Sequence, residues 1–402
     1  MINTPFTLPC GVTLGNRIAK AALTERQAKA NHLPNKRHFD LYDHWAKNGA
    51  GMMLSGNILV DKRYLESTGN VVVEDKTDIT PFKKWAEGVL NHGNHFWAQL
   101  SHAGRQATLF STRKPVSASD VKLNKMGLFG KPKALSESGI EDVIKRFIHG
   151  AVFCKKAGFS GIQFHAAHGY LISQFLSPKT NKREDKWGGS IDNRARLLFT
   201  IVEKARKKLG TNFPISVKLN SADFMKGGYD QNDAKIVIKG LEERGLDLVE
   251  ISGGTYEQTA LFGYGLKEST QRREAYFIDF AKEMKTEYKI PLMVTGGFRS
   301  LDFCNEVLTN EELDIIGFGR PFLIKEDFPS GFINGSDSII PDPYFEVLDK
   351  NNPDNAEAGF YDLQIKNLAK GKGLNHEYSG LRLATHIGIS EMKQGLKNWI
   401  FG

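Results

Sequence analysis

Short apolar segments alternate with amphipathic helical patterns along most of the chain. Most of the apolar segments are bounded by glycine or proline, as buried strands commonly are. The predicted strands are residues 17–23, 51–55, 95–100, 161–165, 214–219, 246–251, 291–295 and 313–317. Regular strand–helix alternation favours parallel strands joined by right-handed crossovers. Eight such units predict an α/β protein built as a single (β/α)8 TIM barrel.

Several of the intervening helices have recognisable ends. Thr80 is the predicted N-cap of one helix, directly before a proline. Ser138 and Glu141 have the spacing of a capping box for a second helix. Ser190 precedes a third helix, and Gly210 ends it. These signals place helices where barrel crossovers are required.

A doubly wound open sheet is the main alternative to the barrel. Its usual G-x-G-x-x-G motif after the first strand is absent from the sequence, and so is a P-loop. Before the first barrel strand, residues 6–8 and 12–14 flank a Pro-Cys-Gly turn. We expect them to form a small hairpin that covers the lower mouth of the barrel.

The strand–helix alternation stops near residue 336. We therefore predict a boundary there, with the barrel in residues 1–335 and an extension packed on it in residues 336–402. Within that extension, residues 351–354 resemble a loop, and residues 361–368 have the pattern of a helix.

Charge and cysteine content narrow the possible partners. The 402 residues include 54 Lys and Arg and 46 Asp and Glu, a net charge of +8. These charges are scattered, so we expect no nucleic-acid partner, although a basic surface can attract an anionic ligand. No apolar stretch approaches the roughly 18 residues of a membrane span. Cys10, Cys154 and Cys304 are widely separated, which favours a reducing, cytoplasmic location, and no secretory signal is visible.

Residues with useful chemistry follow the predicted strands, at the end where barrel enzymes have their active sites. Thr24, Asn57, Gln99 and the pair His165 and His168 follow or end the first four strands. Glycines follow the seventh strand, and Gly319-Arg320 follows the eighth. Backbone N–H groups of glycines together with an Arg side chain suit a phosphate group.

The segment that contains His165, His168 and Tyr170 is the densest chemical cluster. Two imidazoles and a phenol can present three hydrogen-bond donors to one small ligand. A His-x-x-His pair can also bind zinc, with His102 as a third ligand, so a metal-dependent barrel hydrolase is an alternative. No carboxylate pair, which a glycosidase needs, stands at the strand ends, and the G-x-S-x-G motif of many serine hydrolases is absent.

Lys218 lies inside an otherwise apolar strand, where an unpaired charge is costly. The sequence leaves two interpretations open. Lys218 is either one half of an ion pair inside the barrel or a cation for a ligand that carries or develops negative charge.

Several motifs together resemble one enzyme family. They are Asn16-Arg17-Ile18, Ala98-Gln99-Leu100-Ser101-His102-Ala103-Gly104-Arg105, His165-Ala166-Ala167-His168-Gly169-Tyr170-Leu171, Gln174-Phe175-Leu176-Ser177-Pro178, Asn181-Lys182-Arg183, Gly188-Gly189-Ser190, Asn193-Arg194 and Gly317-Phe318-Gly319-Arg320. With them, about residues 4–330 of the chain are similar to the Old Yellow Enzyme family of FMN-dependent NAD(P)H oxidoreductases.

The resemblance implies a role for each candidate residue. The residues along the flavin would be Ala21, Ala22, Leu23 and Thr24, and those near its pyrimidine edge Asn57, Gln99 and Lys218. The phosphate ligands would be Gly297, Gly319 and Arg320. His165 and His168 would bind the substrate oxygen, and Tyr170 would donate a proton. Ala22 and Lys218 replace the Pro and Arg that are usual in the family.

The resemblance also implies a reaction. Bound FMN would take a hydride from NADH or NADPH and pass it to an activated alkene, such as an α,β-unsaturated carbonyl or nitro compound. An FMN-binding flavin or quinone reductase without an alkene substrate is the second alternative. The sequence leaves open whether the protein forms a homo-oligomer.

Overall fold

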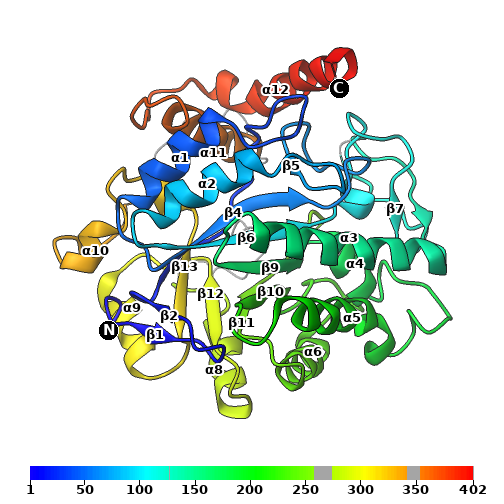
Figure 1. Cartoon of the computed structure of the whole chain (residues 1–402), viewed down its shortest axis with the longest axis horizontal. Helices are drawn as coiled ribbons and strands as arrows, with labels where there is room; N and C mark the ends of the chain where they lie inside the picture. The colour runs from blue at the N-terminus through cyan, green and yellow to red at the C-terminus, as the bar shows by residue number, and fades with distance from the viewer. Residues whose placement is uncertain (126, 258–273, 342–353, 402) are drawn as a thin grey trace.

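The computed structural model describes residues 1–125, 127–257, 274–341 and 354–401. Eight parallel strands close into a barrel surrounded by helices, as the sequence predicts (Figure 1). The barrel strands are β3 (Ile18–Lys20), β4 (Met52–Leu59), β6 (His95–Ser101), β9 (Gly161–Ala166), β10 (Ile215–Asn220), β11 (Leu248–Ser252), β12 (Leu292–Thr295) and β13 (Ile315–Phe318). Their order is β3-β13-β12-β11-β10-β9-β6-β4, and a pairing of β3 with β4 closes the ring.

Helices follow most strands and form the outer layer. They are α1 (Lys36–Ala46), α2 (Thr80–Leu90), α3 (Glu137–Lys156), α4 (Leu171–Leu176), α5 (Ile191–Leu209), α6 (Gln231–Glu243), α8 (Ile278–Glu287), α9 (Leu301–Thr309), α10 (Ser330–Asn334), α11 (Asp354–Leu368) and α12 (Gly380–Phe401). Short 3-10 helices are η1 (Gly104–Gln106) and η3 (Arg320–Leu323). Within the described residues, every helix is too short or too polar to cross a membrane.

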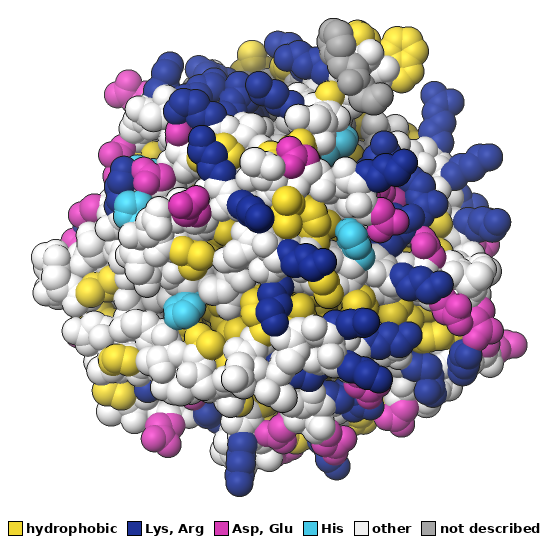
Figure 2. Space-filling view, viewed as in Figure 1, with side chains coloured by type: hydrophobic (Ala, Val, Ile, Leu, Met, Phe, Trp, Pro, Cys, Tyr) yellow, Lys and Arg dark blue, Asp and Glu magenta, His cyan; other side chains and the backbone are white. Residues whose placement is uncertain are grey.

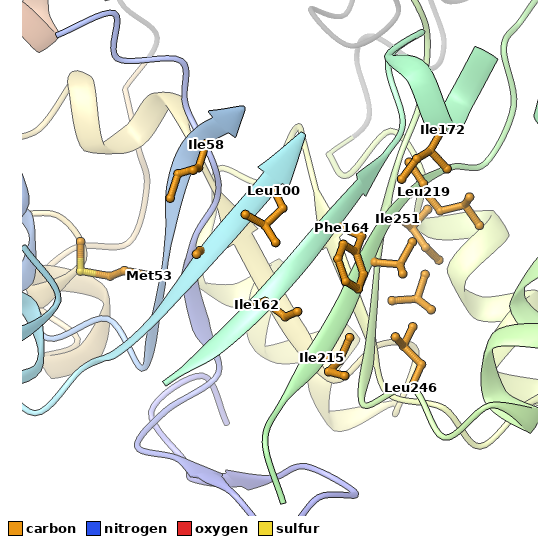
Figure 3. Close-up of a cluster of buried hydrophobic side chains, with 14 of the residues drawn as sticks. Met53, Ile58, Leu100, Ile162, Phe164, Ile172, Ile215, Leu219, Leu246 and Ile251 are labelled. Carbon is orange, nitrogen blue, oxygen red and sulfur yellow. The ribbon is translucent and has the colours of Figure 1, made fainter. Parts of the chain in front are cut away.

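The main core lies between the strands and this outer layer. Alternate strand residues point outward, so Ile162 and Phe164 of β9 and Leu219 of β10 belong to one buried cluster (Figure 3). The residues between them point into the barrel. Figure 2 shows Lys and Arg side chains from the top to the bottom of the visible face, with Asp and Glu side chains among them.

The predicted N-terminal hairpin is present as β1 (Phe6–Thr7) paired antiparallel with β2 (Thr13–Leu14). Leu8 and Leu14 belong to a buried cluster with Trp97 and Leu248, which lie near the amino ends of their strands. The hairpin therefore packs at the end of the barrel opposite the predicted site.

Strand β4 is longer than predicted. Residues 51–55 were expected as the strand, with Gly56 and Asn57 after it, but β4 continues to Leu59 and shifts its pairing register with β6 between Leu54 and Asn57. A Cβ on Gly56 would lie 2.3 Å from the carbonyl oxygen of Leu23. Glycine here permits a close approach of two chain segments, and it does not end the strand. A further short strand, β5 (Val71–Val72), pairs with β4 and was not predicted.

Two predicted helix caps are wrong, and one is confirmed. Ser136, rather than Ser138, accepts the capping hydrogen bond of α3, from the backbone of Gly139. Thr80 lies inside α2 and is not its N-cap. Ser190 caps α5 through Asn193, and α5 ends at Leu209, with Gly210 as its C-cap.

Beyond residue 336, the described elements are the helices α11 and α12, and these two helices pack against each other. Helix α11 contains the predicted segment 361–368 and begins earlier, whereas α12 was not predicted. Residues 351–353 of the predicted loop lie outside the described residues. Helix α11 also contacts α1 and η3, so part of the C-terminal segment packs at the mouth of the barrel. The division into residues 1–335 and 336–402 stays a prediction.

Candidate active site

The predicted site residues line one cavity at the carboxyl ends of the barrel strands. Its volume is about 330 Å³. Among its lining residues are Ala21, Ala22, Leu23, Thr24, Asn57, Gln99, His165, His168, Tyr170, Lys218, Gly297, Gly319 and Arg320. The sequence placed these residues after different strands, and closure of the barrel brings them together.

A buried polar layer adjoins this cavity, and its members Gln99, Lys218 and Thr295 line it. Lys218 Nζ lies 2.7 Å from Glu250 Oε1. The other oxygen of Glu250 accepts a hydrogen bond from Gln163, and Gln163 accepts one from Gln99. Thr295 also donates to Glu250, over 2.7 Å. The layer therefore links five neighbouring strands of the barrel, β6, β9, β10, β11 and β12, through side chains.

Both interpretations of Lys218 find support in this geometry. Lys218 on β10 and Glu250 on β11 lie opposite each other in the strand register, and both side chains are buried. Because Lys218 also lines the cavity, its ammonium group is one of the cations that a ligand there would meet. Glu250 was missed in the sequence, although it is a charge in an apolar strand just as Lys218 is.

The two predicted histidines lie next to each other. His165 and His168 have ring centroids 5.1 Å apart. The Nδ1 atom of His165 accepts from the backbone N–H of Ala167, which leaves Nε2–H as its donor. His168 has a φ of 59°, and its Nε2 lies 2.8 Å from Ser252 Oγ. Burial, followed by the charge of Lys218, lowers the pKa of both rings well below the ordinary value, so both are neutral at pH 7.

Tyr170 lies at the start of α4, with its ring centroid 4.6 Å from that of His165. Its hydroxyl donates a short hydrogen bond to Glu66 and lies 3.0 Å from the hydroxyl of Tyr256. Burial raises the pKa of Tyr170 well above 10, and the nearby Glu66 and Tyr256 raise it further. The phenol is therefore protonated over the whole neutral range.

Thr24 follows β3, and Asn57 lies on β4. Thr24 Oγ1 donates to Glu66 Oε1 over 3.0 Å. Asn57 is 8% exposed, and its Oδ1 is buried without a hydrogen-bond partner among the described residues. Because a buried orphan oxygen is costly, Asn57 has an acceptor to offer to a ligand in the cavity.

The predicted phosphate ligands Gly297, Gly319 and Arg320 also line the cavity. Gly297 has a φ of 87°, and a Cβ on it would lie 2.9 Å from the backbone nitrogen of Ala275, so only glycine fits there. Arg320 begins η3 and donates to Glu357 of α11 over 2.8 Å. The guanidinium group is thus held in place at the cavity wall.

Helix α11 forms part of the wall, which the sequence did not predict. Ala358, Tyr361, Asp362 and Ile365 line the cavity. Asp362 pairs with Arg26, another lining residue, over 3.4 Å. Nothing in the amino-acid pattern indicates which barrel loops a later helix will contact, so these residues had no usable signal.

The metal alternative finds no support in the described part of the chain, where no three His, Cys, Asp or Glu side chains are placed to hold a metal ion. His102 is buried, and its Nε2 lies 4.0 Å from Asp61 Oδ2. It does not line the cavity that contains His165 and His168.

Comparison with known proteins defines the class. The model of the NADH:flavin oxidoreductase / NADH oxidase family matches residues 2–335. The chain is 33% identical over 377 residues to the NADH-dependent flavin oxidoreductase iliE of Hypocrea jecorina (strain QM6a), covering 85% of this chain and 92% of that protein. It is 30% identical to an NADPH dehydrogenase of Bacillus cytotoxicus (strain DSM 22905 / CIP 110041 / 391-98 / NVH 391-98), covering 85% and 94%.

Solved structures show the same fold. The Old Yellow Enzyme homologue from Zymomonas mobilis matches with a TM-score of 0.72 at 23% identity, covering 86% of this chain and 95% of that one. A 2-naphthoyl-CoA reductase matches with a TM-score of 0.78 at 24% identity, covering 83% and 52%. The chain is an NAD(P)H:flavin oxidoreductase. It belongs to the NADH:flavin oxidoreductase / NADH oxidase family, that of Old Yellow Enzyme.

The cavity fits the FMN of this family. A flavin has a polar pyrimidine edge, apolar rings and a phosphate tail. The cavity lining includes the unpartnered oxygen of Asn57 and the ammonium of Lys218. It also includes Gly297 and Arg320. The described residues therefore include groups that suit the polar edge and the phosphate of the cofactor.

Proposed function

We propose that this enzyme uses NADH or NADPH to reduce activated C=C bonds in α,β-unsaturated carbonyl or nitro compounds. The observation that supports this most directly is the arrangement of three lining residues: the ring centroid of His165 lies 5.1 Å from that of His168 and 4.6 Å from that of Tyr170. Two neutral donors and a protonated phenol are the groups that such a substrate requires. The substrate class goes beyond the flavin oxidoreductase activity of the family.

The chemistry that FMN supplies when bound is hydride transfer between the nicotinamide and the substrate. In the proposal, Thr24, Asn57 and Gln99 bind its pyrimidine edge, and Ala21, Ala22 and Leu23 lie along its rings. Lys218 stabilises negative charge near N1, and its pairing with Glu250 fixes the ammonium there. Gly297, Gly319 and Arg320 bind the phosphate.

The histidines and the tyrosine act on the substrate. His165 and His168 donate hydrogen bonds to its carbonyl or nitro oxygen, which draws electron density away from the C=C bond. Because both rings are neutral, they orient the substrate without transferring a proton to it. Tyr170 then protonates the carbon next to the activating group. Its raised pKa keeps a proton available for this step at neutral and mildly alkaline pH.

The test is Tyr170→Phe, which removes one hydroxyl and little volume. Reduction of the enzyme by NADH or NADPH needs no proton from Tyr170 and continues at a similar rate. Reoxidation by cyclohexenone slows by about 10²–10⁴-fold, the usual contribution of a general acid. Reoxidation by a quinone or by oxygen changes far less. Both half-reactions are followed separately by flavin absorbance in a stopped-flow instrument.

Two results would contradict the proposal. If the wild-type enzyme is reoxidised by quinones but not by enones or nitroalkenes, it is a flavin or quinone reductase without an alkene substrate. If Tyr170→Phe slows both half-reactions equally, Tyr170 is a structural residue. A homo-oligomeric state and the cytoplasmic location expected from the cysteines also stay predictions.

A further inference from the structure

Helix α12 exposes an apolar stripe that has no part in the mechanism above. Figure 1 shows the helix at the outer edge of the molecule, with the C-terminus at its end. In a helix with about 3.6 residues per turn, six large apolar side chains of α12 fall within one arc of about 100°. All six are exposed, from 45% to 84%: Leu381, Ile389, Met392, Leu396, Trp399 and Ile400. Single apolar side chains are common on protein surfaces, but a continuous stripe of them marks a surface that binds a partner.

The opposite side of α12 is mostly polar, although it faces the rest of the protein. Glu391 accepts hydrogen bonds from the backbone and the side chain of Thr68. Asn398 donates to the carbonyl oxygen of Thr68 over 2.9 Å, and His386 Nε2 lies 2.8 Å from Asp362 Oδ2. A surface helix ordinarily turns its apolar side inward. In α12 the polar side holds the helix to the protein, so the apolar side is available to a partner.

The exposed charges of α12 are all positive. Lys393 and Lys397 are exposed along one edge of the stripe, and Arg382 is exposed near its start. Glu391 is the only acid in the sequence of α12, and it is buried on the inner side. A second copy of this helix would therefore bring further cations and no exposed carboxylate to pair with them. A negatively charged partner matches the surface better, in keeping with the net charge of +8.

The loop after η1 extends the apolar surface on the side away from the lysines. A Cβ on Gly395 of α12 would lie 3.6 Å from the ring of Phe110, so the helix and this loop lie side by side. Leu109 and Phe110 are 44% and 43% exposed. Arg113 and Lys114 follow them and are exposed as well. The combination of apolar and basic side chains is therefore repeated in a second segment next to the stripe.

We propose that α12 and the Phe110 loop form a docking surface for membranes that contain anionic lipids. The helix lies flat in the interface and does not cross the bilayer, with Trp399 and its apolar neighbours below the lipid headgroups. Lys393 and Lys397 reach the headgroups and contact their phosphates. A fluid bilayer covers the helix and the loop together without a matching shape, and its negative charge balances the exposed cations.

The test is sedimentation of the FMN-bound enzyme with vesicles of phosphatidylcholine, with and without phosphatidylglycerol. We expect binding to the anionic vesicles, little binding to the neutral ones, and weaker binding as the salt concentration rises. Each lysine near a membrane surface contributes about fivefold in affinity, so Lys393→Gln/Lys397→Gln should weaken binding about 25-fold. Trp399→Ala should weaken it about tenfold. Ile236→Ala removes an exposed apolar side chain from α6, and this matched control should bind as the wild type does.

Tryptophan fluorescence tests whether α12 itself enters the interface. Of the five tryptophans, Trp399 is 84% exposed and the other four are buried. Vesicle binding should therefore shift the emission to shorter wavelength and protect it from quenching by acrylamide. Both changes should be absent in Trp399→Phe, because its remaining tryptophans are already buried.

Three results would overturn the proposal. The first is a wild type that does not sediment with anionic vesicles. The second is that Trp399→Ala and the double lysine variant sediment as the wild type does. The third is a dimer without vesicles, seen by sedimentation velocity and abolished by Leu396→Glu, in which Trp399 emission shifts as protein concentration rises; the stripe is then an interface between two copies. Because none of these residues lines the cavity, NADH oxidation without vesicles should match the wild type and confirm that each variant is folded.

Discussion

The two ends of the barrel interior differ in chemistry, although inward-facing residues of the same strands build both. Near the amino ends, the interior contains a buried apolar cluster that includes Ala19, Met52, Leu54, Trp97, Leu248, Met293 and Ile315. Two residues further along, Trp97 is followed by Gln99 and Leu248 by Glu250. The apolar end supports the fold, and the polar end holds the cavity.

This difference shows how the barrel separates stability from chemistry. One two-residue step along a strand leads from tightly packed side chains to a layer of linked polar groups. Substitutions at the apolar end should therefore change the free energy of unfolding and leave the site unchanged. Those at the mouth should change ligand binding with little effect on stability. Substitutions in the Lys218–Glu250 layer between the two ends should change both the free energy of unfolding and ligand binding.

The largest effect is expected for Lys218→Met, because it acts on both properties. It leaves Glu250 buried without its cationic partner, which costs about 3–5 kcal/mol of unfolding free energy. It also removes a cation from the proposed FMN site, so FMN binding should weaken and the flavin should be harder to reduce. The measurements are urea unfolding of the apoprotein, FMN affinity, and the reduction potential of the bound flavin.

The double variant Lys218→Met/Glu250→Gln is the matched control for this pair. It removes both charges, so most of the stability should return, whereas FMN affinity and potential should stay altered. If FMN binding and the flavin potential are unchanged in Lys218→Met, the lysine is only a structural charge.

Trp97→Ala tests the apolar end. Trp97 is completely buried, and removal of a large buried side chain typically costs about 3–5 kcal/mol. Urea unfolding should show this loss. In protein that remains folded, FMN affinity and both half-reaction rates should stay close to wild type, with Trp97→Phe as a milder control. A parallel loss of FMN affinity would mean that the two ends of the barrel are coupled.

The mouth of the barrel is tested by Arg320→Ala. Hydrogen bonds to charged groups contribute about 1.5–3 kcal/mol, so FMN affinity should fall by about 10- to 100-fold, with little change in unfolding of the apoprotein. Glu357→Gln should act in the opposite direction, because Arg320 would no longer be shared with a carboxylate. Fluorescence titration with FMN measures both. Equal affinities in all three proteins would show that Arg320 does not bind the phosphate.

The sequence predicted the barrel well because the relevant signals are local. Each predicted strand overlaps one barrel strand, since apolar segments with Gly or Pro at their ends depend only on neighbouring residues. The errors come from competition that local signals cannot resolve. Ser136 and Ser138 are both suitable caps, and their hydroxyls lie 3.0 Å apart. Gly56 resembles a strand end but allows a close approach to Leu23.

The site was predicted unevenly for the same reason. Residues such as Gln99 and His165 follow predicted strands, so the barrel geometry alone brings them together. Glu250 could have been found by the argument applied to Lys218, since the two charges face each other on adjacent strands. Glu66, from a loop, contacts Tyr170, and Tyr361, from the distant helix α11, lines the cavity. Nothing in their neighbouring residues indicates that either side chain lies at the site.

The smallest expected effect is the change of stability with pH, which should depend on the polar end of the barrel interior and not on the apolar end. The buried apolar cluster has no titratable side chain. His102, directly after β6 at the other end, is buried and its pKa is lowered from 6.5 to about 4, mainly by that burial. Below pH 6.5 the unfolded chain therefore binds a proton at His102 that the native protein does not, and stability is lost as pH falls.

For His102 alone, this linkage amounts to about 1 kcal/mol between pH 7.5 and 5.5. Urea unfolding at these two pH values should show a smaller loss for His102→Gln than for the wild type, by that amount. The wild type should lose more in total, because burial also lowers the pKa of His165 and His168. Trp97→Phe, at the apolar end, should keep the full wild-type pH dependence. If His102→Gln loses as much stability as the wild type, His102 keeps an ordinary pKa in the native protein, and the acid sensitivity of the polar end comes from its other histidines.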